Sequence, residues 1–176
     1  SVALLHNTSE DELLRQALVR ANEIISMGTG AVEIKSGYGL TVEDEMKMLR
    51  VAKRVAENTP LTVRTTFLGA HAVPARYKDN RVGYVNEIVD EMIPAVAAEG
   101  LAEYVDIFCE EGFFSVEDAE RIFEQGIKYG MKPTVHANQM SFSGGVQVGV
   151  KYDAISVDHL EFTGPAEYEV LANSNT

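Results

Sequence analysis

Several features that would assign a chain to a particular class are scarce in these 176 residues. Cysteine occurs once, at Cys109, which excludes an internal disulfide and is typical of a reducing cytoplasm. No stretch approaches the ~18–20 consecutive apolar residues that a membrane span needs, so we expect no membrane partner. The first residues lack the basic region and the small-residue cleavage site of a secretory signal. Together these absences predict a cytoplasmic protein.

Positive charge is also scarce. The chain has 15 basic and 27 acidic residues, a formal net charge of −12, and its Lys and Arg residues are scattered rather than clustered. Such a chain repels phosphate backbones, which argues against nucleic acid as a partner. The acidic residues fall mostly in helical stretches such as "SEDELL" and "TVEDEM", and we expect them to form solvated outer faces. With 45% hydrophobic and 24% charged residues, the composition fits one ordinary domain with a real core.

Short apolar runs rich in β-branched residues alternate along the chain with longer stretches of helical periodicity. The runs expected to form strands are residues 31–35, 61–69, 103–110, 132–137 and 153–160. The stretches expected to form helices are residues 9–28, 41–57, 83–99, 115–130 and 144–152, with a last one beginning near residue 163. Ser9 and Glu12 are spaced as a capping box, and Pro94 predicts a kink or an irregular turn in its helix.

The fold class follows from this alternation. Strands that are apolar throughout and separated by helices form a parallel α/β sheet. No glycine-rich dinucleotide fingerprint follows the first strand, which argues against a Rossmann fold. Polar residues instead collect just after the strand ends, which favours a (β/α)8 barrel of the TIM type. Five strands are too few for that barrel, which typically takes about 250 residues. Either the sheet is open and doubly wound or the chain is a piece of something longer, and we expect the piece.

The polar residues that follow the five strands include three of the four histidines, His71, His136 and His159. Alone, His136 is as readily a hydrogen-bonded core histidine as a ligand. Three histidines at the same edge of a parallel sheet instead predict a polar pocket ringed by imidazoles, with a metal-binding or catalytic role. For His71, the alternative is a loop residue that caps a turn before Pro74. The fourth histidine, His6, is expected at the surface.

Other residues near the strand ends have simpler explanations. Asp158 is expected to point to the side of its strand opposite His159 and to be a structural carboxylate. Lys35 is more simply an ion-pair partner than a carbamylated lysine that bridges two metals. Cys109 is expected to be a small buried hydrophobe rather than a nucleophile. Tyr38 lies between two glycines in "SGYGL", where the backbone can approach a ligand closely or simply pack in a turn.

At "IKSGYGL", "TTFLGAHAVP", "VDIFCE", "VHANQ" and "SVDHLE" the chain closely resembles the imidazolonepropionases, amidohydrolase-superfamily enzymes of histidine degradation. The resemblance runs from about residue 10 to about residue 165. It implies a distorted (β/α)8 barrel beside a small β-sandwich, and hydrolysis of 4-imidazolone-5-propanoate to N-formimidoyl-L-glutamate with one zinc or iron ion. Residues 1–176 would then be a partial barrel domain that carries roughly strands 2 to 6, without the first and last strands and the β-sandwich.

The resemblance also implies roles for single residues. His136 matches the histidine that ligates the metal from the fifth strand, and His159 matches the catalytic histidine beside the metal-bound water. His71 and Tyr38 match substrate contacts, and His71 is a candidate donor to the oxyanion of the reaction. Gln139 matches the position that holds the imidazolone ring. The H-x-H of the family's first strand and the metal-binding aspartate of its eighth have no counterpart in these residues.

Three functions remain open at this point. The first is a cyclic amidohydrolase with one metal, whose small-molecule substrate carries a propionate. Four cations could meet that propionate, namely Lys35, Arg64, Arg76 and Arg81, and none of them is favoured. The second is another cyclic amidohydrolase, with two metals bridged by Lys35. The third is a non-catalytic half-barrel that only binds or dimerises. The full-length parent is expected to be a homodimer.

Overall fold

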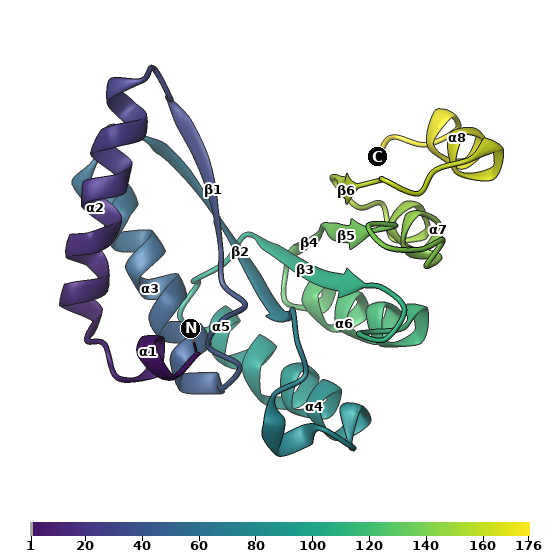
Figure 1. The fold of residues 1–176 in the computed structure, drawn as a ribbon, viewed down its shortest axis with the longest axis horizontal. Coiled ribbons are helices and arrows are strands. Elements are labelled where there is room, and N and C mark those ends of the chain that lie inside the picture. Colours follow the sequence, from purple (N-terminus) through teal and green to yellow (C-terminus); the bar gives the residue numbers. More distant parts are fainter. Residues whose placement is uncertain (1) are drawn as a thin grey trace.

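The computed structural model describes residues 2–176, which form alternating strands and helices (Figure 1). The strands are β1 (Ala31–Lys35), β2 (Thr62–Ala70), β3 (Tyr104–Cys109), β4 (Lys132–Pro133), β5 (Val135–Ala137) and β6 (Val157–His159). The α-helices are α1 (Val2–His6), α2 (Glu10–Ser26), α3 (Val42–Asn58), α4 (Arg81–Glu87), α5 (Ile93–Ala98), α6 (Val116–Lys128), α7 (Gly145–Lys151) and α8 (Pro165–Ala172). Two short segments are the 3-10 helix η1 (Ala75–Tyr77) and the π-helix η2 (Ile88–Met92). The predicted alternation is confirmed.

The strands form one parallel sheet in the order β1-β2-β3-β5-β6, with β4 paired to β3. Within residues 2–176, β4 and β5 both pair with β3, and every other strand pairs with the one that precedes it in the sequence, so the order never reverses. A doubly wound sheet reverses its strand order at a switch point, whereas a barrel adds its strands in sequence. The topology therefore fits part of a (β/α) barrel, and the open doubly wound alternative was wrong.

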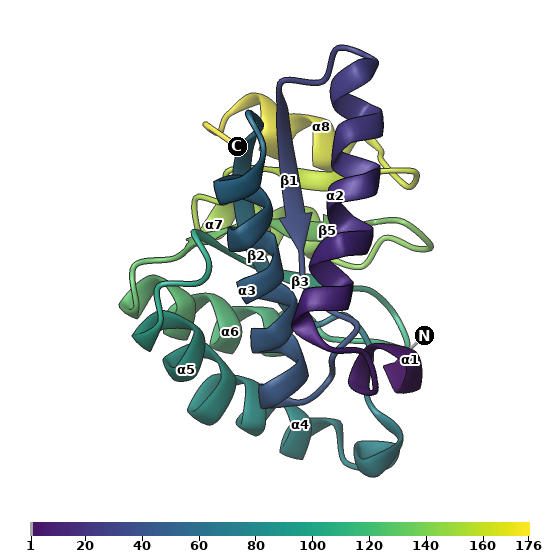
Figure 2. The ribbon, with the colours of Figure 1, turned by 90° about the vertical axis from the view of Figure 1, so that its left-hand side faces the viewer.

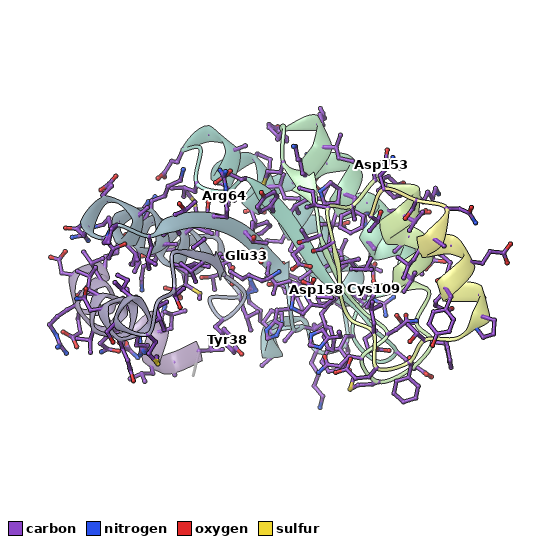
Figure 3. All side chains as sticks on the ribbon, turned by 90° about the horizontal axis from the view of Figure 1, so that it is seen from above. Glu33, Tyr38, Arg64, Cys109, Asp153 and Asp158 are labelled. Carbon is purple, nitrogen blue, oxygen red and sulfur yellow. The ribbon has the colours of Figure 1, made fainter. Side chains whose placement is uncertain are left out.

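Lys35 shows that the sheet is strongly rolled. Its Nζ lies 2.7 Å from an oxygen of Asp106 on β3 and 3.4 Å from an oxygen of Asp158 on β6. In a flat sheet, four strand spacings of ~4.8 Å would hold β1 and β6 ~19 Å apart, far beyond the reach of a lysine side chain. Figure 3 shows Glu33 of β1 and Asp158 of β6 facing the same central space. The chain is therefore a parallel half-barrel with a charged interior.

Helices cover the outer face of the half-barrel. In Figure 2, α2 and α3 lie side by side over β1 and β2, and α5 and α6 continue the layer. Thr41 caps α3 by accepting the backbone N–H of Asp44 at 3.2 Å, as N-cap residues do. The inward side of α3 carries Met46 and Leu49 into the main core between the helices and the sheet. None of the helices within residues 2–176 is both long enough and apolar enough to span a bilayer.

The predicted helix 83–99 is irregular where Pro94 required it. The helical path runs as α4, the π-helix η2 and α5, and Pro94 lies in the first turn of α5. Proline lacks the N–H that would continue the helical ladder, and its ring crowds the preceding turn. The wider π turn just before Pro94 accommodates both effects, so the predicted irregularity is confirmed.

Two predicted strands and one cap differ from expectation. The run 132–137 is divided into β4 and β5 at Thr134, although both halves pair with β3 and Thr134 still donates its N–H to Val105. The run 153–160 is a strand only over β6, because the chain leaves α7 through a left-handed residue, Asp153, at φ 50°. Ser9 caps α2 through the N–H of Glu12 at 3.3 Å, but the carboxylate of Glu12 binds Arg15 instead of completing the box.

Candidate metal and substrate site

Five rings line the C-terminal edge of the sheet, one from each strand position and in the order of the strands. The Tyr38 ring lies 5.0 Å from the His71 ring, and the His71 ring lies 6.3 Å from the Phe108 ring, measured between centroids. Phe108 lies 6.4 Å from His136, which lies 5.1 Å from His159. The strand ends therefore bring the predicted site residues to one rim, as expected for a barrel active-site face.

The rim also corrects one expectation. His136 and His159 are neighbours, but Phe108 stands between His71 and His136, with centroid distances of 6.3 and 6.4 Å to the two imidazoles. The imidazoles therefore do not all gather at one ion-sized point. The row therefore has two ends, a His136–His159 end and a Tyr38–His71 end.

A charged network lies beneath His136 in the interior of the half-barrel. Asp106, whose side chain is completely buried, places Oδ2 2.7 Å from Lys35 Nζ and 3.0 Å from His136 Nδ1. Lys35 also lies 3.1 Å from Glu33 and 3.4 Å from Asp158. A buried carboxylate needs such partners, because an unpaired charge away from water is strongly unfavourable. The network therefore anchors the base of the rim.

The pKa values of the network favour its charged form. Burial acts to raise the pKa of Asp106, but His136 and Lys35 outweigh burial and hold that pKa below its ordinary value. Burial likewise acts to lower the pKa of Lys35, but Asp106 and Glu33 outweigh it and raise the pKa above its ordinary range. Lys35 is therefore an ammonium ion paired with carboxylates, as its simpler explanation predicted. Carbamylation needs a neutral amine, so these contacts disfavour a bridging role.

Three residues offer donor atoms for a cation. One ligand atom each from Asp106, His136 and Asp158 lie within 4.8 Å of one another. Among the described residues, Nδ1 of His136 is buried and makes no well-formed hydrogen bond, since the approach of Asp106 at 3.0 Å has the distance but not the angle of one. An imidazole nitrogen that lacks a partner and neighbouring carboxylates suit zinc or iron. The residues therefore fit an ion at His136, with Lys35 already neutralising the two carboxylates.

Asp158 does not point away from the site, so that expectation was wrong. It pairs in register with His136, and its carboxylate reaches Lys35, while the ring of His159 contacts the ring of His136. The side chains of a regular strand alternate between its faces, but His159 has φ 78° and Leu160 has φ 65°. This left-handed turn ends β6 and brings two consecutive side chains to the same site.

The glycines on either side of Tyr38 are required by the packing of the loop rather than by the approach of a ligand. Gly37 has φ 114°, and a Cβ there would lie 2.9 Å from the Leu68 carbonyl oxygen. At Gly39 a Cβ would lie 2.4 Å from the backbone nitrogen of Glu45. The tight loop lets the Gly37 carbonyl accept a hydrogen bond from His71 Nδ1 at 3.2 Å. The tyrosine itself is half exposed beside His71. Close packing of the loop therefore explains both glycines and sets the tautomer of His71.

Gln139 follows β5 on a loop that is held by the buried carboxylate of Glu110. Its backbone N–H donates to Glu110 at 2.9 Å, and its half-buried amide side chain forms no hydrogen bond within residues 2–176. Its neighbour Asn138 is fully buried at φ 53° and donates from Nδ2 to the Phe162 carbonyl at 2.9 Å. Asn138 is thus structural, and Gln139 is the amide of the pair that remains open to a ligand.

The expectation that the acidic stretches form solvated faces was wrong at several positions. Asp44 and Glu45, in "TVEDEM", have exposed fractions of 2% and 0%. Asp44 binds Lys47 at 2.8 Å and the exposed His6 at 2.7 Å. Glu45 accepts hydrogen bonds from the loop that carries Tyr38, and burial raises its pKa above the ordinary value. The first turn of a helix favours acidic residues whether they face solvent or a neighbouring loop, so composition does not separate the two.

Asp106, like Glu45, was not predicted from the sequence as a residue of the site. It is an acidic residue in the middle of the otherwise apolar strand "YVDIFC", and that mismatch was an available signal. The nearby Cys109 is fully buried, and burial, with a smaller effect from Glu110, raises the pKa of its thiol to about 12. The prediction that Cys109 is a small hydrophobe is confirmed.

The whole chain matches curated proteins named imidazolonepropionase. The relative from Flavobacterium johnsoniae is 53% identical over 176 residues, which is 100% of this chain and 43% of the relative. The relative from Flavobacterium psychrophilum is 53% identical over 172 residues, 98% of this chain and 42% of the relative. The relative from Ectopseudomonas mendocina is 46% identical over 176 residues, 100% of this chain and 44% of the relative. The chain thus spans less than half the length of these relatives. No protein-family model matches it.

Proposed function

We infer that the chain belongs to the imidazolonepropionase family, because it is similar to these proteins over its whole length. We therefore propose that the complete protein hydrolyses 4-imidazolone-5-propanoate to N-formimidoyl-L-glutamate. In this proposal, residues 1–176 supply roughly strands 2 to 6 of a (β/α)8 barrel, and the remaining strands and the β-sandwich lie outside the chain. The rolled parallel sheet supports the proposal, since Lys35 joins its first strand to its last. The observation that carries it is the single rim of rings.

His136 would hold one zinc or iron ion, together with ligands from outside these residues. Such an ion, when bound, lowers the pKa of water toward ~7 and polarises a carbonyl, which suits hydrolysis of a cyclic amide at neutral pH. Asp106 approaches the imidazole of His136 from the buried side at 3.0 Å, and Lys35 holds Asp106 in place. His159, whose ring centroid lies 5.1 Å from that of His136, would accept a proton from the attacking water and pass it to the ring nitrogen as the C–N bond breaks.

The other end of the rim would hold the substrate. Because the Gly37 carbonyl can only accept, His71 donates from Nδ1, and its Nε2 is an acceptor while the ring is neutral. His71 therefore donates to the oxyanion only as an imidazolium, and as a neutral ring it accepts from a substrate N–H. Gln139 offers a donor and an acceptor, which matches a ring N–H beside a C=O. Tyr38 would contact the substrate from the edge beside His71.

The propionate partner would come from outside the chain. The four candidate cations already hold carboxylates: Lys35 binds Asp106, Arg64 binds Glu103, Arg76 binds Glu87 and Arg81 binds Asp118. Recruiting one of them would leave an acidic group behind. We also expect the complete protein to be a cytoplasmic homodimer, which sedimentation and cell fractionation would test.

The test is turnover together with metal content in the purified complete protein. We expect consumption of 4-imidazolone-5-propanoate with formation of N-formimidoyl-L-glutamate, and about one zinc or iron ion per chain. Two ions per chain would favour the Lys35-bridged alternative. If a chelator abolishes the activity and added metal restores it, the turnover depends on the bound metal. A metal-loaded protein that leaves the substrate intact would contradict the proposed function.

A further inference from the structure

Two buried carboxyl groups bind the loops of the rim, and within residues 2–176 neither forms a hydrogen bond to a ring of the rim. The first is Glu45, which is completely buried at the start of α3. Its Oε2 accepts the N–H of Gly37 at 2.9 Å, and its Oε1 accepts those of Gly39 and Leu40 at 2.8 and 2.9 Å. These donors flank Tyr38, and Gly37 also binds His71. One carboxyl group therefore fixes the segment that supports the Tyr38–His71 end of the rim.

The second carboxyl group is Glu110, at the end of β3 and 2% exposed. Its Oε2 accepts the N–H of Gln139 at 2.9 Å and that of Met140 at 3.0 Å, and its Oε1 accepts the hydroxyl of Ser141. Burial acts to raise the pKa of Glu110, but the Ser141 hydroxyl and the backbone amides outweigh burial and lower it. Glu110 is thus held as a carboxylate directly under the loop of Gln139.

Neither group is needed to cap a helix. Thr41 already caps α3, and Ser115 with Asp118 forms the capping box of α6. Glu45 instead lies in the first turn of α3, after the cap, and turns back to the loop that joins β1 to α3. A carboxyl group that accepts two or three loop N–H groups at once defines the loop's position, since a buried N–H left unpaired is unfavourable.

We propose that Glu45 and Glu110 are positioning residues, which set the Tyr38–His71 pair and Gln139 at the places where substrate is bound. The proposal rests on the proposed function for its substrate. The two groups act only through hydrogen bonds to the backbone, so they determine where the contacts lie and not what chemistry they perform. Misplacing a binding group by ~1 Å can cost up to about 100-fold in rate.

The experiment uses Glu110→Gln and Glu45→Gln in the metal-loaded complete protein. Glutamine keeps the shape of glutamate but replaces one accepting oxygen with an NH2 group, which opposes a loop N–H. We expect each variant to keep its metal and its fold and to lose about 10- to 100-fold in kcat/KM, mainly through a higher KM for Glu110→Gln. Glu167→Gln is the matched control, because Glu167 is also buried and also accepts a backbone N–H, from Gly164 at 3.0 Å. The control should stay within about twofold of wild type.

Double-mutant cycles separate positioning from general structural support. Glu110→Gln should have less than about a threefold effect in a Gln139→Ala background, and Glu45→Gln should likewise lose most of its effect in a His71→Ala background. Equal fold losses in both backgrounds would overturn the positioning role, as would unchanged kcat/KM in a folded variant. If Glu45→Gln fails to fold, the double-mutant cycle of Glu110 and Gln139 still tests the positioning role. An inactive wild-type protein would contradict the proposed function itself, whereas an active wild type with an unaffected Glu110→Gln contradicts only this inference.

Discussion

His136→Ala in the complete protein is expected to remove the bound metal and to lower kcat/KM by about 1,000-fold or more. The metal's stabilisation of charge is worth several kcal/mol, and each ~1.4 kcal/mol is a factor of ten in rate. His136 has the position for a ligand, with Asp106 behind its ring and His159 beside it. Metal analysis of the purified variant, beside steady-state kinetics, measures both effects.

His71→Ala is the control for that experiment. His71 lies on the same rim but is separated from His136 by Phe108, so its removal should leave metal content unchanged. If His71 acts as an imidazolium that donates to the oxyanion, its loss should cost about 100- to 1,000-fold in kcat. If His136→Ala binds metal as wild type does, the assignment of the ligand is wrong. If His71→Ala loses the metal instead, the division of the rim into a metal end and a substrate end is wrong.

Lys35→Met is expected to lower the free energy of unfolding by about 3–5 kcal/mol, because it leaves the buried carboxylate of Asp106 without its ammonium partner. The methionine keeps most of the volume of the lysine stem, so the loss reports the charge rather than a cavity. The 3.0 Å approach of His136 to Asp106 offsets only part of the loss, since His136 makes no well-formed hydrogen bond there. Denaturant titration of the metal-free complete protein gives the value.

Arg54→Met is the matched control for Lys35. Arg54 pairs with Asp11 at 2.9 Å, where Asp11 is largely exposed, and exposed pairs of this kind contribute about 0–1 kcal/mol. A loss below about 1 kcal/mol for Lys35→Met, similar to that of the control, would show that the interior network is solvated and does not anchor the rim.

The sequence was sufficient for features that depend on local pattern. Apolar runs ending near Lys35 and Cys109 form strands because β-branched and aromatic residues favour the pleated surface of a sheet, although only the second of these strands is buried almost throughout. Ser115 and Thr41 mark helix starts because their side chains satisfy the first backbone N–H groups. The histidines gather at one rim because parallel strands all end at the same edge. These inferences need no knowledge of distant partners.

The features that the sequence did not predict depend on residues far apart in the chain. Asp158 faces Lys35 because it lies in register with His136 across the strand pair, and the left-handed turn at His159 brings the next side chain to the same site. No local sequence pattern indicated either feature. Glu45 looked like an ordinary acidic residue of a first helical turn, and its three donors belong to the preceding loop. The interposition of Phe108 between two histidines depends on the register of β3 against β5. Such contacts are set by tertiary packing rather than by periodicity.

Anomalous diffraction from crystals of the metal-loaded complete protein is the most direct test of the arrangement at the rim. We expect one peak about 2.0–2.2 Å from a ring nitrogen of His136, with Lys35 still paired to Asp106 and His71 on the far side of Phe108. A metal bound instead by Lys35 and the interior carboxylates, or at a site that does not include His136, would contradict the account.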